Sequence, residues 1–349
     1  MGTGASRPKR RINLALQGGG AHGAFTWGVL DRLLEDDSIE IAAISGTSAG
    51  ALNGAALKSG LVTGGPDGAR ENLDWLWSTV GRLGSSLPAA WMSLLSPALL
   101  SNALENSPAY GMLEAGSGLF SPYDSGPFYT NPLTPIVERF RYDAVCHPGG
   151  PPLHICATNV RSGKIRVFTG AGIGVRPILA SACLPTLFRA VEIEDPATGR
   201  TEAYWDGGYT GNPALFPLFE AALPPDIVVI NINPLYREEV PRTTRQIENR
   251  INEIGFNTSL FRELRAIAFV QRLLDEGMVP PGSMKEVFVH MIADDALMNQ
   301  LSVATKLVAL PPILNALKSA GREAAETFLE VHGEHLNRRG SVDLQAMFN

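Results

Sequence analysis

The sequence has few cysteines and no long hydrophobic run. Its three cysteines, Cys146, Cys156 and Cys183, are an odd number without the spacing of zinc ligands. This pattern argues against a disulfide framework and against a metal site, and it indicates a reducing, cytoplasmic compartment. Because no run of about 18 apolar residues occurs, we expect no membrane-spanning helix.

Charged residues are also scarce, at 18 % of the 349 residues. The chain has 29 Lys and Arg against 35 Asp and Glu, which gives a formal net charge of −6. This balance argues against a general nucleic-acid-binding protein, which needs a basic face. Hydrophobic residues, at 45 %, supply enough apolar material for a large core. We therefore expect a packed globular protein with one large domain or two modest ones.

Residues 1–11 (MGTGASRPKRR) are basic. The apolar run that follows them is interrupted at once by Gln17 and three glycines, so it does not have the continuous apolar region of a signal peptide. We expect a disordered basic arm over residues 1–11.

Two strand–turn–helix units open the rest of the chain. Residues 12–16 are apolar and stop at glycines, after which apolar residues recur with helical spacing up to about residue 36. A second apolar run over residues 39–45 ends in the sequence GTSAG, and a helix of small residues is expected over residues 51–59. Such repeated units imply parallel strands with right-handed crossovers, and hence an α/β domain with helices on both faces of a sheet.

The pattern changes after residue 60. Residues 60–150 are rich in Gly, Pro and Ser without strand-like alternation, which predicts helices and loops. Strand signals return as two hairpins over residues 153–169 and 190–205, and then near residues 226–232 and 287–292. Beyond residue 243 we expect mainly helices, with one apolar stripe that packs on the core or serves as a dimer surface. The stripe consists of Ile247, Ile251, Ile254, Phe261, Leu264 and Ala268.

The first motif is a glycine-rich loop. Residues 18–23 (GGGAHG) fit G-x-G-x-x-G between a strand and a helix, which is the setting of a dinucleotide-binding fingerprint. That fingerprint also requires an acidic residue at the end of the second strand, where this chain has Ser45 and Gly46. A dinucleotide-binding oxidoreductase therefore remains only an alternative.

The second motif, residues 46–50 (GTSAG), is a G-x-S-x-G sequence between a strand and a helix. A serine at this sharp turn projects its hydroxyl from the sheet, and Gly46 and Gly50 allow the strand and helix to approach closely. The motif predicts Ser48 as a nucleophile. Backbone N–H groups of the glycine loop could stabilise the oxyanion of an acyl transfer.

A serine nucleophile needs a base, and Asp206 has the most suitable setting. It ends a predicted strand before Gly207 and Gly208, which leave room for a close approach. None of the downstream histidines follows a strand in this way. These histidines are His147, His154, His290, His332 and His335.

In this order, the glycine loop, the G-x-S-x-G turn and the D-G-G sequence resemble the motifs of the patatin-like phospholipase family. The resemblance continues through residues 157–159, 181–185 and 206–213, and covers about the first two thirds of the chain. It implies a three-layer α/β/α sandwich with a mainly parallel sheet. It also implies a histidine-free dyad, with Ser48 as nucleophile and Asp206 as base. The implied oxyanion donors are Gly18, Gly19 and Gly20, with motif support from His22, Gly23, Gly46, Gly50, Gly207 and Gly208.

The loop departs from the family at one position. The family usually carries Arg or Lys where this chain has His22, so a cationic contribution from this position would depend on pH. The backbone donors are unaffected by this change.

The resemblance implies a hydrolase for carboxylic esters of acyl lipids, of the phospholipase A, lysophospholipase or esterase type, without metal or cofactor. The expected partner is an acyl lipid or ester, with transient contact to a membrane surface and no nucleic acid. Homo-oligomers are compatible with the sequence. A non-catalytic regulator with the same fold is a further alternative, although intact Ser48 and Asp206 argue against it.

We expect three segments. The arm over residues 1–11 precedes a catalytic domain over residues 12–235, which contains the helical insertion at about 60–150. A mainly helical region over residues 236–349 packs on the same domain. Within the insertion, residues 87–100 are strongly apolar, which predicts a packed helical subdomain or a lid over an acyl pocket.

Overall fold

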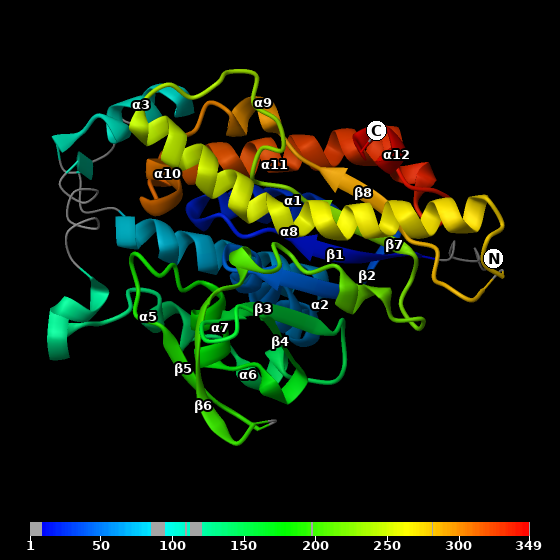
Figure 1. The fold of residues 1–349 in the computed structure, drawn as a ribbon, viewed down its shortest axis with the longest axis horizontal. Helices are drawn as coiled ribbons and strands as arrows, with labels where there is room; N and C mark the ends of the chain where they lie inside the picture. The colour runs from blue at the N-terminus through cyan, green and yellow to red at the C-terminus, as the bar shows by residue number, and fades with distance from the viewer. Residues whose placement is uncertain are drawn as a thin grey trace, which may run out of the picture.

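A central β-sheet organises the molecule (Figure 1). The sheet has the order β5-β6-β3-β2-β1-β7-β8, with β4 paired to β3. The computed structural model describes residues 9–84, 95–108, 110–111, 121–196, 198–280 and 282–348. The strands in these residues are β1 (Arg10–Leu16), β2 (Ile39–Thr47), β3 (Leu153–Asn159), β4 (Ile165–Thr169), β5 (Val191–Asp195), β6 (Arg200–Asp206), β7 (Asp226–Ile230) and β8 (Phe288–Ile292).

Strands β3, β2, β1, β7 and β8 run parallel, whereas β4, β5 and β6 form antiparallel pairs. Leu16 at the end of β1 lies opposite Gly46 on β2 and Ile230 on β7. The carboxyl ends of these parallel strands therefore meet at one edge of the sheet. The expected α/β fold with a mainly parallel sheet is confirmed, and this edge carries the residues discussed below.

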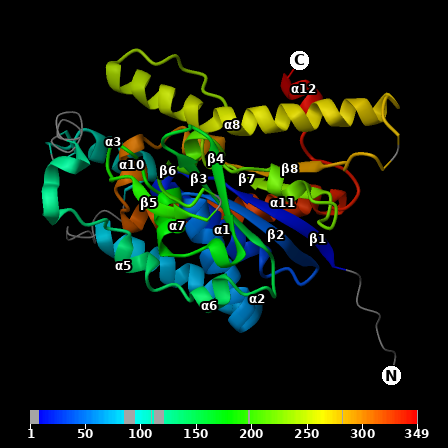
Figure 2. The same ribbon diagram turned by 60° about the horizontal axis from the view of Figure 1, so that its bottom comes forward.

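Helices cover both faces of the sheet, which gives three layers (Figure 2). Side chains alternate along β1, so Leu14 and Leu16 join the core under α1, α2 and α11, whereas Ala15 joins the core under α8 and α12. The helices of these two layers are α1 (Gly23–Leu33), α2 (Ala49–Gly84), α8 (Thr244–Asp275), α11 (Pro311–His332) and α12 (Leu344–Phe348). The shorter helices are α3 (Pro97–Glu105), α5 (Thr134–Val137), α6 (Tyr142–Val145), α7 (Val175–Ser181), α9 (Asp295–Met298) and α10 (Val303–Leu307).

Helix α2 is much longer than the helix expected over residues 51–59. It continues to Gly84 and bends at Gly65, which has a φ of 64°. Pro66 follows the bend, where the first turn of the second half does not need its missing N–H. The helical content expected for residues 60–150 is found in the described parts of that segment.

Core packing of the apolar stripe expected on α8 is wrong for the first half of the helix, whereas its use as a dimer surface stays a prediction. Ile247, Ile251 and Ile254 are exposed, the last two by 62 % and 52 %, whereas Leu264 is fully buried. The helix packs on the sheet only in its second half, so regular spacing alone did not show which half is covered.

A further expectation concerns the N-terminal residues of the chain. Strand β1 begins at Arg10 because Arg10 and Arg11 pair with Ile39 and Glu40, so the end of the expected basic arm is part of the sheet. Residues 1–8 of that arm lie outside the described residues.

Most of the expected lid, residues 87–94, also lies outside the described residues. In its described remainder, Leu100 is buried at 3 % exposure and Leu99 is exposed at 57 %. Among the helices of the described residues, none combines the length and the apolarity needed to cross a bilayer.

Candidate active site

Ser48 lies at the sharp turn between β2 and α2. Its φ of 54° is in the left-handed region, which is unusual for a residue with a side chain and is a strain found at functional sites. A Cβ on Gly50 would lie 2.1 Å from the carbonyl oxygen of Leu16, and one on Gly46 would lie 2.5 Å from the carbonyl oxygen of Gly50. Only glycine fits at these two positions, so the turn sits directly against the end of β1.

Asp206 ends β6 and is fully buried. Its Oδ1 accepts a hydrogen bond from Gly208 N at 2.7 Å, and no hydrogen bond of good geometry reaches Oδ2 within the described residues. Burial raises the pKa of Asp206 to about 7, against smaller lowering effects from Gly208 N–H and the Ser48 hydroxyl. The fold thus brings the two expected dyad residues together.

The glycines after Asp206 are required by close packing. A Cβ on Gly207 would lie 2.2 Å from the carbonyl oxygen of Cys156, and one on Gly208 would lie 2.3 Å from the ring of Phe256 on α8. Helix α8 therefore rests directly on the turn that carries the carboxylate.

The five downstream histidines make their described contacts elsewhere. His290 is buried and pairs with Asp226 at 3.0 Å, at the start of β7, and His332 contacts His335 at 3.3 Å. His147 accepts a hydrogen bond from Gly149 N, and no hydrogen bond of good geometry reaches Nε2 of His154 within the described residues.

Two asparagines that sequence reasoning missed hold the glycine loop. Gly18 N donates to Asn212 Oδ1 at 2.7 Å, and Gly18 O accepts from Asn233 Nδ2 at 2.8 Å. The Gly18 amide is therefore engaged, which differs from the expectation that it donates to an oxyanion. Within the described contacts, Gly19 N and Gly20 N have no acceptor. Asn233 follows β7 at the carboxyl edge of the sheet, and this position after a predicted strand could have identified it in the sequence.

His22 is buried behind this loop. Its Nε2 lies 2.8 Å from Thr305 Oγ1, and its Nδ1 has no hydrogen-bond partner among the described residues. Burial, followed by the nearby charges of Lys306 and Arg237, lowers the pKa of His22 well below its usual 6.5. The side chain is therefore neutral at neutral pH, so the pH-dependent cation expected at this position is absent there.

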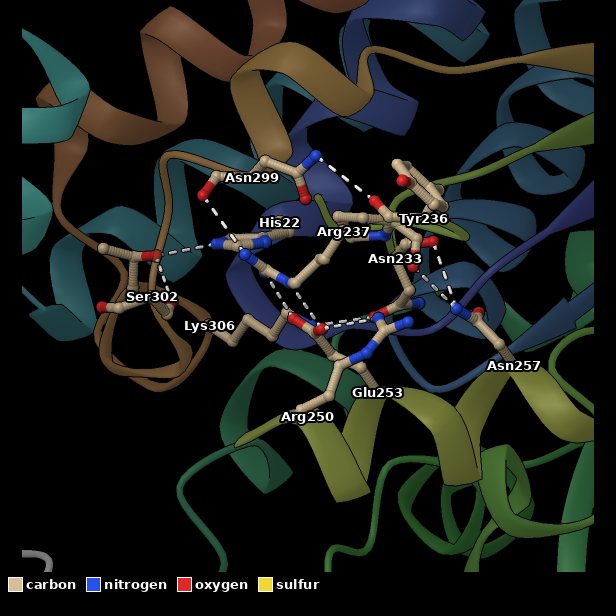
Figure 3. Close-up of polar contacts among 12 residues, drawn as sticks. His22, Asn233, Tyr236, Arg237, Arg250, Glu253, Asn257, Asn299, Ser302 and Lys306 are labelled. Atoms are coloured by element: carbon tan, nitrogen blue, oxygen red, sulfur yellow. Dashed lines mark hydrogen bonds and ion pairs between the residues drawn. The ribbon is translucent and has the colours of Figure 1, made fainter. Parts of the chain in front are cut away.

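A polar cavity of about 540 Å³ lies between α3, the start of α8 and the segment before α10. In its wall, Arg237 donates to both carboxylate oxygens of Glu253 at 2.8 and 2.6 Å, and Arg250 joins the same carboxylate at 3.3 Å (Figure 3). Its described lining does not include Ser48 or Asp206. The described lining of this cavity is therefore distinct from the residues expected for the active site.

Comparison with known proteins gives one family and a few distant structures. Residues 14–221 match the family described as patatin-like phospholipase. VipD from Legionella pneumophila is 15 % identical, with a TM-score of 0.43 over 93 % of this chain and 67 % of VipD. The type III effector ExoU is 16 % identical, with a TM-score of 0.36 over 93 % of this chain and 53 % of ExoU.

A second ExoU structure, the heterodimeric ExoU–SpcU complex from Pseudomonas aeruginosa, is 15 % identical, with a TM-score of 0.33 over 95 % of this chain and 52 % of that one. The chain thus spans about half the length of ExoU. No curated protein matches the sequence.

Proposed function

Because this chain belongs to the patatin-like phospholipase family, a family of lipid acyl hydrolases, we propose that it cleaves carboxylic esters of acyl lipids with Ser48 as nucleophile and Asp206 as base. One observation carries the finer assignment. Ser48, held at a left-handed turn, lies beside the fully buried carboxyl group of Asp206, whose Oδ2 has no hydrogen bond of good geometry among the described residues. No observation favours the oxidoreductase alternative.

The raised pKa of Asp206 suits a base that acts directly on a hydroxyl. A carboxylate of ordinary pKa is a weak base toward serine, whereas one with a pKa of about 7 accepts a proton more readily and is still largely ionised above neutrality. Ser48 Oγ would attack the ester carbonyl while its proton passes to Asp206.

The amides of Gly19 and Gly20 would then stabilise the oxyanion. Collapse of the tetrahedral intermediate breaks the ester bond, and Asp206 returns the proton to the leaving alcohol. Asp206 next takes a proton from water as this water attacks the acyl-enzyme, which releases the fatty acid and restores Ser48. Because the dyad lacks an imidazole, oxyanion stabilisation must contribute much of the rate.

We propose that residues 12–235 and 236–349 form one catalytic unit. Helix α8 of the second segment holds the loop after Asp206, since Asn212 N donates to Ser259 Oγ at 3.0 Å. Glu263 Oε2 accepts hydrogen bonds from Leu215 N at 2.8 Å and Phe216 N at 2.7 Å.

An acyl-lipid substrate also implies transient contact with a lipid surface.

The test is a comparison of the wild type with Ser48→Ala. We expect the wild type to hydrolyse p-nitrophenyl esters and members of an acyl-lipid panel, and to be labelled at Ser48 by a fluorophosphonate. We expect Ser48→Ala to lose hydrolysis by about 1000-fold or more and to lose the label, while its melting temperature stays within a few degrees. A wild type without hydrolysis or label would indicate the non-catalytic alternative.

A further inference from the structure

The glycine loop of this chain has no charged side chain at position 22 at neutral pH. His22 is buried, bonded through Nε2 to Thr305, and neutral at neutral pH. If a positive charge contributes to this site, it must come from another element.

Lys306 on α10 places an ammonium group beside the same loop (Figure 3). Its Nζ donates to Asn233 Oδ1 at 2.9 Å, and Asn233 Nδ2 donates to Gly18 O at 2.8 Å. Asn233 Oδ1 also lies 3.5 Å from the place where a Cβ on Gly19 would be. The Lys306 backbone is closer still, because a Cβ on Gly20 would lie 2.2 Å from Lys306 O. Helix α10 therefore packs its backbone on the loop and reaches it with the Lys306 side chain through Asn233.

We propose that Lys306 is a positioning residue for ester hydrolysis: its positive charge orders Asn233 against the glycine loop and favours the negative oxygen that forms there. The inference rests on the function proposed above. It assigns this charge to the C-terminal region, 284 positions after His22 in the sequence.

The surrounding charges leave the Lys306 ammonium available for this role. The charged and titratable groups that face it are Arg237 before α8, Glu253 on α8 and His22 behind the loop. Glu253 is already engaged by Arg237 and Arg250, and Lys306 forms no ion pair within the described residues. Its charge is therefore not neutralised by a carboxylate in contact, and its hydrogen bond is directed at Asn233.

The primary test separates charge from hydrogen bonding. Lys306→Gln keeps a donor for Asn233 Oδ1 but removes the charge. Because the effect belongs to the transition state, we expect kcat for a short p-nitrophenyl ester to fall about tenfold or more while KM changes less than about twofold. Lys318→Gln is the matched control, because Lys318 on α11 pairs with Asp74 on α2 at 2.9 Å. The kcat of this variant should equal that of the wild type.

Two variants restore the charge. Lys306→Arg should keep at least about a third of the wild-type kcat. The double variant His22→Lys with Lys306→Gln moves the cation into the loop and should recover a measurable part of the activity lost in Lys306→Gln. A merely structural role for Lys306 predicts no recovery from a charge placed at position 22.

The pH profile gives an independent readout. Burial, together with Arg237 and against Glu253, lowers the pKa of Lys306 from its usual 10.5. The wild-type kcat should therefore fall on the alkaline side below pH 10.5, and this fall should be missing in Lys306→Arg, whose guanidinium stays charged. This comparison stands even if Lys306→Gln fails to fold.

The outcomes are distinct. A folded Lys306→Gln protein with wild-type kcat, or an unchanged alkaline fall in Lys306→Arg, overturns the inference. A wild type that neither hydrolyses esters nor reacts with a fluorophosphonate overturns the proposed function itself. Labelling of the wild type with equal rates in all Lys306 variants leaves the proposed function standing and removes only the role of Lys306.

Discussion

The turn at Ser48 and helix α8 meet at the same edge of the sheet, but they are held there by different kinds of contact. Around Ser48, backbone lies against backbone, and a Cβ on Gly50 would overlap the carbonyl of Leu16. On α8, side chains reach across to the neighbouring loop, as Glu263 does to the amides of Leu215 and Phe216. The first kind of contact tolerates no added atom, whereas the second depends on charge and protonation.

Asp206→Asn should have the largest effect, because it removes the base while keeping the shape of the side chain. We expect hydrolysis to fall about 1000-fold or more. Single replacements of His147, His154, His290 or His332 should leave measurable turnover in each folded variant, and His335 belongs to the same control set. A folded histidine variant as inactive as Ser48→Ala would instead indicate a triad.

The same variant should gain stability above neutrality. The pKa of Asp206 is raised from 3.8 to about 7 in the folded protein, so the folded state holds its proton more tightly than the unfolded chain. The stability of the wild type therefore falls as pH rises between these values and stays lower above them. We expect Asp206→Asn to melt about 2 °C or more above the wild type at pH 8, and at nearly the same temperature at pH 4.

Gly50→Ala tests the backbone contacts of the turn. An added methyl group would meet Leu16 O at 2.1 Å, so we expect a loss of about 1–3 kcal/mol or more in the free energy of unfolding, measured with denaturant. Gly64→Ala is the control on the same helix, because a Cβ there would meet nothing within 4 Å. Equal effects at both positions would show that helix propensity, and not the close contact, decides stability here.

The pH dependence of hydrolysis tests whether Asp206 alone sets the acid side of the profile. Because its carboxylate must be ionised and its pKa is about 7, kcat/KM should fall about tenfold per pH unit well below pH 7. His22 should add no second step near 6.5, since its pKa lies well below that value. A step near 6.5 that disappears in His22→Gln would contradict a permanently neutral histidine.

Glu263→Gln should have the smallest effect and concerns the side-chain contacts of α8. The pKa of Glu263 is raised by burial from 4.5 to about 7, so its contribution to the stability of the wild type decreases as pH rises between these values. A glutamine resembles the protonated acid and still offers an oxygen to Leu215 N and Phe216 N. We expect denaturation midpoints of the variant to vary less with pH over this range than those of the wild type.

The sequence predicted the parts of the site that depend on backbone contact. Gly46, Gly50, Gly207 and Gly208 are needed because neighbouring backbone or rings leave no room, and such needs appear as motifs near Ser48 and Asp206. The family resemblance then supplied the pairing of the two residues. The parallel sheet followed from short apolar runs separated by helices.

The supporting side chains could not be predicted in the same way. Asn212 and Lys306 come from a loop and a short helix far from the glycine loop in the sequence, and no local pattern states which of many polar residues will reach it. The core packing expected for the stripe on α8 was wrong in its first half for a related reason. Spacing placed Ile247, Ile251 and Ile254 on one face, but only tertiary packing decides whether that face is covered.

The contact of α8 with the loop after Asp206 determines which segment of this chain a gene fusion would have to carry. The segment that matches the family ends at residue 221, before α8 begins. A gene fusion that carried only residues 14–221 into another protein would transfer Ser48 and Asp206 but leave the amides of Leu215 and Phe216 without Glu263. On the catalytic unit proposed above, the transferable segment would be longer than its recognisable motifs, and we expect recombination within residues 222–263 to be selected against.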